Sequence, residues 1–194
     1  MSFEFNDGGR KESGRKGSTG DCVCRAIAIA SELPYEEVYK RLAEGNATQR
    51  KSKRQWKDRK KTASEGITTK RKWFKDYMKE LGFEWVATMG IGTGCTTHLC
   101  PDELPKGRLV VNLSRHLTTM IDGVINDTYN PQRVDIEGNQ KRCVYGYWEL
   151  IKRKEEPKKY KEKTTEELTI ELLNEHPDLR DFLLHGVPIP PIDE

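Results

Sequence analysis

Cys22, His116 and Asp127 are of the residue types that carry thiol catalysis. Such chemistry needs a thiol whose pKa is lowered from about 8.5, an imidazole beside it and a polar group that holds the imidazole. Cys22 follows Gly17 and Gly20 and precedes a run rich in Ala and Ile, which predicts that it begins a helix. The helix dipole would favour a thiolate there, and first-turn amides would receive an oxyanion. The alternative is a small buried residue at a helix start.

His116 and Asp127 are predicted to be neighbours across a β-hairpin. An apolar run from His116 ends at the turn signal Asp122–Gly123, and a second run from Val124 ends at Asp127. In an antiparallel hairpin, the first strand starts beside the end of the second. Asn126 is the other polar residue that could hold the imidazole, but strand alternation turns it to the opposite face. In the alternative interpretation, His116 is a structural residue and Asp127 caps the following turn.

The elements that must position these residues are predicted as helices first and strands afterwards. Apolar periodicity and cap residues predict helices over 22–33, 34–45 and 70–81. Apolar runs between turn signals predict strands over 83–88, 108–113, 116–121, 124–128 and 143–150. Helices followed by an antiparallel meander are typical of the α+β class, in which helices pack on a sheet.

The chain organisation follows from shifts in composition. Residues 1–20 hold five glycines and predict an irregular arm, and residues 21–150 carry the periodic patterns of the core. A basic insertion interrupts the core at about 45–66. A charged linker over 151–163 then leads to a helical tail over 164–194, which opens on a capping box.

Composition limits the classes of protein and of location. The chain has 194 residues, of which 35% are hydrophobic and 34% charged, which fits one domain with polar appendages. Its apolar runs are far shorter than the roughly 18 residues that cross a bilayer, and its N-terminus lacks the pattern of a secretory signal. We therefore expect no membrane partner and a cytoplasmic location.

The segment Arg50–Lys72 concentrates positive charge. It holds eleven Lys and Arg residues against two acids, although the whole chain has a net charge of only +3. Such a block could neutralise phosphates, with Trp56 and Trp73 stacking on bases, so nucleic acid is one candidate partner. A solvated loop, or a loop that steers an acidic protein, is the alternative.

The other cysteines allow three interpretations. The number of cysteines, five, is odd, which together with a reducing compartment disfavours a disulfide framework. Cys24 lies two residues after Cys22 and would face another side of the helix, which predicts a core position. Cys95, His98 and Cys100, with Cys143 as a fourth ligand, could hold zinc. Alternatively, the loop 90–100 borders the thiol site, with His98 lining it or acting as the base in place of His116.

Two resemblances extend this interpretation. The segment 19–26, TGDCVCRA, resembles the nucleophile turn of papain-fold peptidases of the bacteriocin-processing and related bacterial types, and 114–116 with 122–128 resembles their His and Asp strands. The runs NDGGR at 6–10, GTGC at 92–95 and DELPKGR at 102–108 look like a group of small phage and prophage proteins of unassigned function. The resemblance covers residues 5–150, roughly the chain without its tail.

The resemblance implies a papain-like α+β fold and a Cys-His-Asp thiol hydrolase or acyl transferase. Cys22 would attack an amide or isopeptide of a protein or peptide substrate, His116 would shuttle the proton and Asp127 would hold the imidazole. The family uses no cofactor, and a phage protein would act in the host-cell cytoplasm.

Papain-like enzymes place a Gln about six residues before the nucleophile to bind the oxyanion. Here Lys16 stands six residues before Cys22, and Lys16, Ser18 and Thr19 are the candidates for that role. The alternative function is a non-catalytic phage protein that binds nucleic acid or a host protein through the basic insertion and the tail. A third hypothesis is that the protein is a small module stabilised by zinc.

Overall fold

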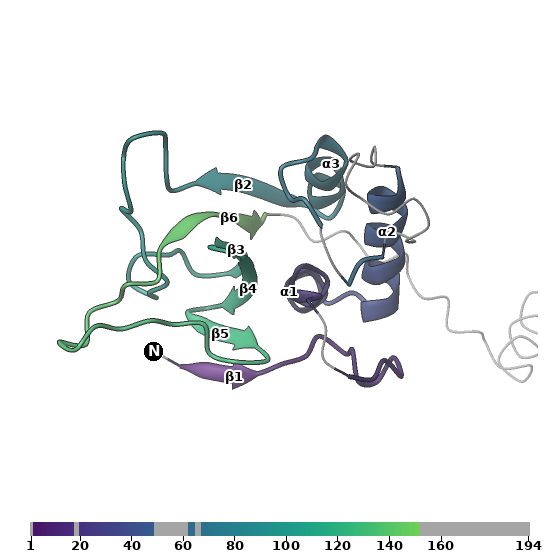
Figure 1. Ribbon diagram of the computed structural model, residues 1–194, viewed down its shortest axis with the longest axis horizontal. Coiled ribbons are helices and arrows are strands. Elements are labelled where there is room, and N and C mark those ends of the chain that lie inside the picture. The colour runs from purple at the N-terminus through teal and green to yellow at the C-terminus, as the bar shows by residue number, and fades with distance from the viewer. Residues whose placement is uncertain (1, 18–19, 49–61, 65–66, 152–194) are drawn as a thin grey trace, which may run out of the picture. The chain divides into compact units, whose positions relative to one another are not determined.

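The computed structural model describes residues 2–17, 20–48, 62–64 and 67–151 (Figure 1). The chain divides into two units, Met1–Lys154 and Glu155–Glu194, and every described residue belongs to the first. Most of the predicted basic insertion, all but the first residue of the linker and the whole tail lie outside the described residues. Their predictions therefore stay predictions.

The described unit is α+β, as predicted. Its helices are α1 (Cys22–Ser31), α2 (Tyr35–Ala47) and α3 (Lys72–Glu80). Its strands are β1 (Phe3–Phe5), β2 (Phe83–Ala87), β3 (Arg108–Leu113), β4 (His116–Ile121), β5 (Val124–Asp127) and β6 (Val144–Leu150). The longest of these helices has 13 residues, and within the described ranges none is long and apolar enough to cross a membrane.

The six strands form one sheet in the order β1-β5-β4-β3-β6-β2. Strands β3, β4 and β5 form the predicted antiparallel meander, and β6 returns to pair with β3 and β2. The β4–β5 turn consists of Asp122 and Gly123, both with positive φ (48° and 87°), which suits the twist of a two-residue hairpin. This turn fixes the register at Ile121 opposite Val124.

Strand β1 corrects two predictions, because residues 1–20 are not wholly irregular and the sheet is not wholly antiparallel. Phe3, Glu4 and Phe5 pair in parallel with Ile125, Asn126 and Asp127. A three-residue strand is too short for alternation to identify it in sequence. Its position depends on the edge that β5 offers, which only the assembled sheet provides.

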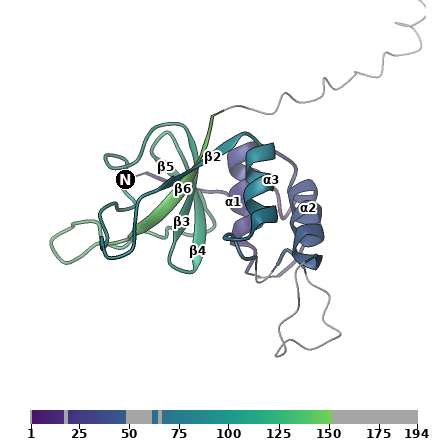
Figure 2. The same ribbon diagram turned by 90° about the horizontal axis from the view of Figure 1, so that it is seen from above.

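The three helices lie on one side of the sheet (Figure 2). α1 packs directly on β4 and β3, where the Thr119 hydroxyl donates a 2.8 Å hydrogen bond to the Ala26 carbonyl. Small residues on α1 allow this close approach, and the core between helices and sheet includes Cys24, Ile27, Val38, Leu42, Phe74, Met78, Phe83, Val110, Leu117 and Trp148. The apolar face of each helix is thereby removed from water.

α2 continues two residues past Gly45, where the sequence predicted its end. The Trp73 ring lies against the backbone of Gly45, in the space that a Cβ atom would occupy. Gly45 therefore serves close packing between α2 and α3 rather than helix termination.

The other face of the sheet carries a second apolar cluster, which includes Leu99, Leu104, Leu109, Val111, Leu113, Met120, Ile125 and Val144. Leu99 and Leu104 come from the long connection between β2 and β3. The Thr97 carbonyl accepts a hydrogen bond from Val144 N, and Leu99 N donates to the Arg142 carbonyl, at 2.9 and 2.8 Å. Backbone hydrogen bonds therefore hold this connection against the start of β6.

That pairing brings two cysteines together and corrects a further prediction. Cys95 and Cys143 form a disulfide, with Cα atoms 5.8 Å apart, although a disulfide was disfavoured from the sequence. The partners lie 48 residues apart, and only the pairing of the connection with β6 makes them neighbours. Because the disulfide uses two of the four predicted zinc ligands, that zinc site is not formed, and the described residues hold no group of three metal ligands.

Candidate functional site

The direction of α1 brings Cys22 to the start of β4. Arg108, the first residue of β3, donates from Nε to the Ala30 carbonyl at 2.7 Å and so satisfies the C-terminal end of α1. The other end of β3 is paired with His116, since Leu113 lies opposite it. α1 is about 15 Å long, close to the length of β3. Its N-terminus, and with it Cys22, therefore reaches the end of the sheet where His116 lies.

His116 and Asp127 form the centre of the candidate site. His116 Nε2 lies 2.7 Å from Asp127 Oδ2, and the two residues are only 7% and 5% exposed. The second carboxylate oxygen of Asp127 accepts from the backbone N–H of Thr128 at 2.7 Å. The hairpin register thus brings together the two residues that the sequence paired. Asn126, the other candidate to hold the imidazole, is bonded instead to Asn6.

The Cys22 thiol interacts with the same imidazole, which is one of the causes of its pKa shift. Burial alone would raise the pKa of Cys22, but its hydrogen bonds to His116 and to the backbone of Leu117, with the charges of His116 and Arg25, lower that pKa overall. Because Nε2 of His116 faces Asp127, the Nδ1 side of the ring is left for the sulfur.

Whereas the pKa of the Cys22 thiol is lowered, the pKa of the His116 imidazole is raised. Burial would lower its pKa, but the hydrogen bonds and negative charges of Asp127 and Cys22 raise the pKa of His116 to about 9. A lowered thiol pKa beside a raised imidazole pKa favours a thiolate–imidazolium pair near neutral pH. The two groups titrate as a coupled unit.

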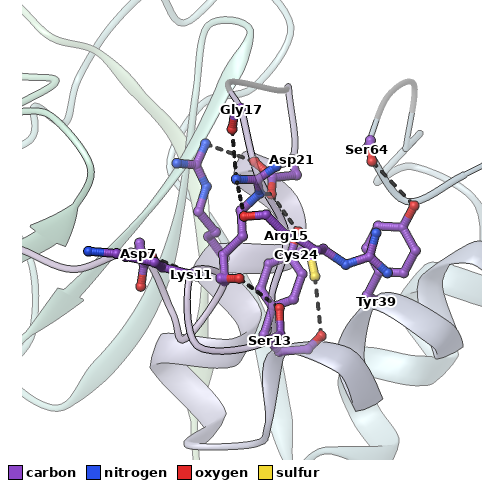
Figure 3. Close-up of polar contacts among 12 residues, drawn as sticks. Asp7, Lys11, Ser13, Arg15, Gly17, Asp21, Cys24, Tyr39 and Ser64 are labelled. Carbon is purple, nitrogen blue, oxygen red and sulfur yellow. Dashed lines mark hydrogen bonds and ion pairs between the residues drawn. The ribbon is translucent and has the colours of Figure 1, made fainter.

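Asp21, the residue before Cys22, is the centre of a buried ion-pair cluster (Figure 3). It is 1% exposed and lies 2.9 Å from Arg10 Nε and 3.0 Å from Arg25 Nη2. The Tyr35 hydroxyl donates to the same carboxylate. These three partners fix the backbone immediately before the thiol.

Because Asp21 faces these partners, its side chain makes no capping hydrogen bond to α1. The first amides of a helix have no partner within the helix. The N–H groups of the first turn of α1, beginning with that of Cys22, therefore donate no hydrogen bond to the Asp21 side chain.

Arg25 joins α1 to the strand that carries Asp127, a role that the sequence analysis missed. Its Nη1 donates to the Thr128 hydroxyl at 2.9 Å, and Thr128 is bonded to Asp127. A series of contacts therefore runs from Asp21 through Arg25, Thr128, Asp127 and His116 to Cys22. The peptide bond between Asp21 and Cys22 closes this series into a ring. The available sequence signal was the spacing of Asp21 and Arg25, four residues apart on one helix.

Tyr129 lies beside the imidazole. The ring centroids of Tyr129 and His116 are 5.1 Å apart with an interplanar angle of 37°. Tyr129 is itself half exposed, so its ring separates part of the His116–Asp127 pair from solvent. No sequence pattern indicates this contact, since Tyr129 follows the strand that the hairpin pattern defines.

The candidate residues for the oxyanion site are only partly described. Ser18 and Thr19 lie outside the described residues. The Lys16 side chain is exposed, and its carbonyl accepts from Arg10 Nη2 at 3.0 Å. Arg10 also donates to the Gly17 carbonyl at 2.8 Å, so its guanidinium holds the backbone of Lys16 and Gly17.

The remaining sequence candidates lie elsewhere. Cys24 is fully buried, as predicted, its sulfur contacts the Tyr35 carbonyl, and burial raises the pKa of Cys24 to about 12. His98 Nδ1 lies 3.3 Å from both carboxylate oxygens of Glu103. The neighbouring Leu99 packs on the sheet face that α1 does not cover. This placement associates the loop 90–100 with Glu103 and β6 rather than with Cys22.

No protein-family model, curated protein or solved structure matches this chain. The geometry of the site is therefore the basis for assigning a function to this chain.

Proposed function

We propose that this protein is a papain-like cysteine hydrolase, a peptidase, isopeptidase or acyl transferase of phage type, with Cys22, His116 and Asp127 as its catalytic triad. The supporting observation is the buried His116–Asp127 pair at 2.7 Å, whose imidazole also bonds a thiol at the N-terminus of α1. Nucleophile, base and orienting group in hydrogen-bonded succession are the arrangement that thiol catalysis requires.

The proposed reaction begins with attack of the Cys22 thiolate on the carbonyl carbon of an amide. A C–S bond forms and the carbonyl electron pair moves to oxygen, where the amides of the first turn of α1 stabilise it. The His116 imidazolium then donates its proton to the leaving nitrogen as the C–N bond breaks, which leaves a thioester on Cys22.

The thioester is resolved by a second nucleophile. His116, now neutral, accepts a proton from water as the water oxygen attacks the thioester carbon, and the C–S bond breaks to release a carboxylic acid and the thiolate. An amine in place of water would give acyl transfer. Asp127 keeps the ring oriented and stabilises its charged form in both halves of the reaction.

The test is hydrolysis in ¹⁸O-labelled water of a mixture of peptides and isopeptide-linked conjugates. The wild-type protein is expected to produce new carboxyl ends that carry ¹⁸O, and Cys22→Ala and His116→Gln are expected to produce none. Cys100→Ala is the matched control, since Cys100 is a half-buried free cysteine that bonds the Asp102 carboxylate. Equal labelling by wild type and Cys22→Ala would contradict the proposal.

The alternative function is binding without catalysis. It is favoured by the eleven basic residues of Arg50–Lys72, which would engage nucleic acid or an acidic host protein, with the tail as a second contact. Retention on immobilised nucleic acid that weakens steeply with salt, in a protein with an unreactive Cys22, would support it. Action in a host-cell cytoplasm belongs to both proposals.

A further inference from the structure

Arg142 is a buried cation without a carboxylate partner among the described residues. It is 8% exposed, its Nη2 donates to the Ser114 carbonyl at 3.1 Å, and its Nε has no hydrogen-bond partner within the described part of the chain. Burying a charge is costly unless an opposite charge compensates it. A single neutral carbonyl is a weak partner for a guanidinium with five N–H donors.

Other buried or half-buried arginines of the unit are compensated. Arg10 and Arg25 both pair with Asp21, and Arg108 pairs with Glu32 at 2.8 Å. Arg142 takes part in none of the ion pairs among the described residues, in which Arg10, Arg15, Arg25, Arg41 and Arg108 each have a carboxylate partner. Its unmatched charge is therefore particular to this position rather than a general feature of the protein.

Arg142 also contacts the turn that leads into His116. Ser114, which it binds, is two residues before His116 in the tight turn between β3 and β4. Tyr129, whose ring lies beside His116, is in the electrostatic field of Arg142 as well as those of Asp127 and Cys22. The positive charge thus acts on the tyrosine whose ring lies beside the imidazole.

We propose that Arg142 binds a carboxylate of the substrate, so that the enzyme prefers amides with a carboxylate near the scissile bond. This inference rests on the proposed function and names its substrate class. A guanidinium matches the two oxygens of a carboxylate with two parallel N–H donors, and the pair is strong where water is partly excluded. Substrate binding would supply the compensating charge that the free protein lacks at Arg142.

The test compares alkylation of Cys22 by iodoacetate, which carries a carboxylate, with alkylation by neutral iodoacetamide. Arg142→Gln is expected to slow the iodoacetate reaction about tenfold while the iodoacetamide rate changes less than about twofold. Arg115→Gln is the matched control, because it removes an equal charge one residue from His116 on an exposed side chain. Arg115→Gln should leave the ratio of the two rates near the wild-type value.

The outcomes separate this inference from the proposed function. An unchanged ratio in Arg142→Gln, with a reactive Cys22, would overturn the role of Arg142 and leave the hydrolase standing. A Cys22 that reacts with iodoacetamide no faster than a free thiol would overturn the proposed function itself, and with it this inference.

A second measurement needs no substitution and so remains valid if Arg142→Gln does not fold. Three competitors are compared for protection of wild-type Cys22 from iodoacetamide: N-acetylglutamine amide, N-acetylglutamate α-amide and N-acetylglutamine with a free α-carboxylate. At least one anionic competitor is expected to protect at a several-fold lower concentration than the neutral one. The better anion distinguishes an acidic side chain from a chain terminus as the source of the carboxylate. Equal protection by all three would overturn the inference.

Discussion

His116 Nε2 and Asp127 Oδ2 lie 2.7 Å apart in the interior, at the point where the first strand of a hairpin starts and its second strand ends. The pair has a second connection, because Thr128 holds the other Asp127 oxygen and is held in turn by Arg25 of α1. The imidazole is therefore fixed both to the sheet and to the helix that carries Cys22. A histidine with only a structural role would need the Asp127 contact, but it would not need a thiol on the other side of its imidazole.

Asp127→Asn is expected to destabilise the protein by about 1.5–3 kcal/mol at pH 6, the usual contribution of a hydrogen bond to a charged group. The pKa of His116 is raised to about 9, above the roughly 6.5 of an unfolded chain. The stability that its charged form contributes is therefore complete below about pH 6.5 and lost as the pH rises through about 9.

Denaturant unfolding of wild type and Asp127→Asn at a series of pH values measures this dependence. The difference in unfolding free energy should shrink between about pH 6.5 and 9. Asn126→Asp is a useful comparison, since Asn126 bonds Asn6 rather than His116, and its effect should not follow the His116 titration. A difference that grows with pH would contradict the assignment.

Arg25→Gln is expected to raise the pKa of the Cys22 thiol and to slow its alkylation at pH 6. The charge of Arg25 favours the thiolate, and its bond to Thr128 supports the Asp127 side of the site. Arg25→Lys keeps the charge and should retain a larger part of the reactivity. Arg41→Gln removes an exposed arginine paired with Glu80 and should change the alkylation rate little. Equal rates in Arg25→Gln and wild type would show that Arg25 does not act on the thiol.

Gly45→Ala is expected to lower the free energy of unfolding by about 1–3 kcal/mol, because the added methyl group would occupy the space of the Trp73 ring. In an exposed helix the same substitution would stabilise the protein by about 1 kcal/mol. The sign of the measured change therefore shows whether the Trp73 ring occupies this space. Gly90→Ala, in an exposed loop where the nearest side chain is Thr93, is the matched control for thermal unfolding. A stabilised Gly45→Ala would mean that α2 and α3 do not pack as described.

Reduction of the Cys95–Cys143 disulfide is expected to cost about 2–4 kcal/mol of stability while leaving the reactivity of Cys22 intact. The disulfide ties the connection before β3 to the start of β6, and Leu99 of that connection packs on the face away from α1. Unfolding of Cys95→Ser/Cys143→Ser, together with iodoacetamide rates for Cys22, measures both effects. A parallel loss of Cys22 reactivity would show that the disulfide supports the site.

The parts of the site that the sequence predicted are those that local signals determine. The turn of Asp122 and Gly123 fixes the hairpin register, and this register alone makes His116 and Asp127 neighbours. The run of small and apolar residues after Cys22 defines α1 in the same way. Neither prediction needed any knowledge of the remaining chain.

The parts that could not be predicted depend on contacts between distant segments. β1 needs the exposed edge of β5, and the disulfide needs the connection to lie along β6. The roles of Arg25 and Arg142 follow from the groups that the fold places beside them, a carboxylate beside Arg25 and only a backbone carbonyl beside Arg142. A sequence shows that an arginine is present, but its partners are determined by the packing of the whole unit.

The central claim is that Cys22 is a thiolate held by the His116 imidazolium. The most direct test is the rate of Cys22 alkylation by iodoacetamide as a function of pH, in wild type and in His116→Gln. The wild type is predicted to reach a high rate at a pH below 8.5, about the value of a free thiol, and His116→Gln is predicted to move that transition upward. A wild-type transition at or above the free-thiol value, or one that His116→Gln leaves in place, would contradict the account.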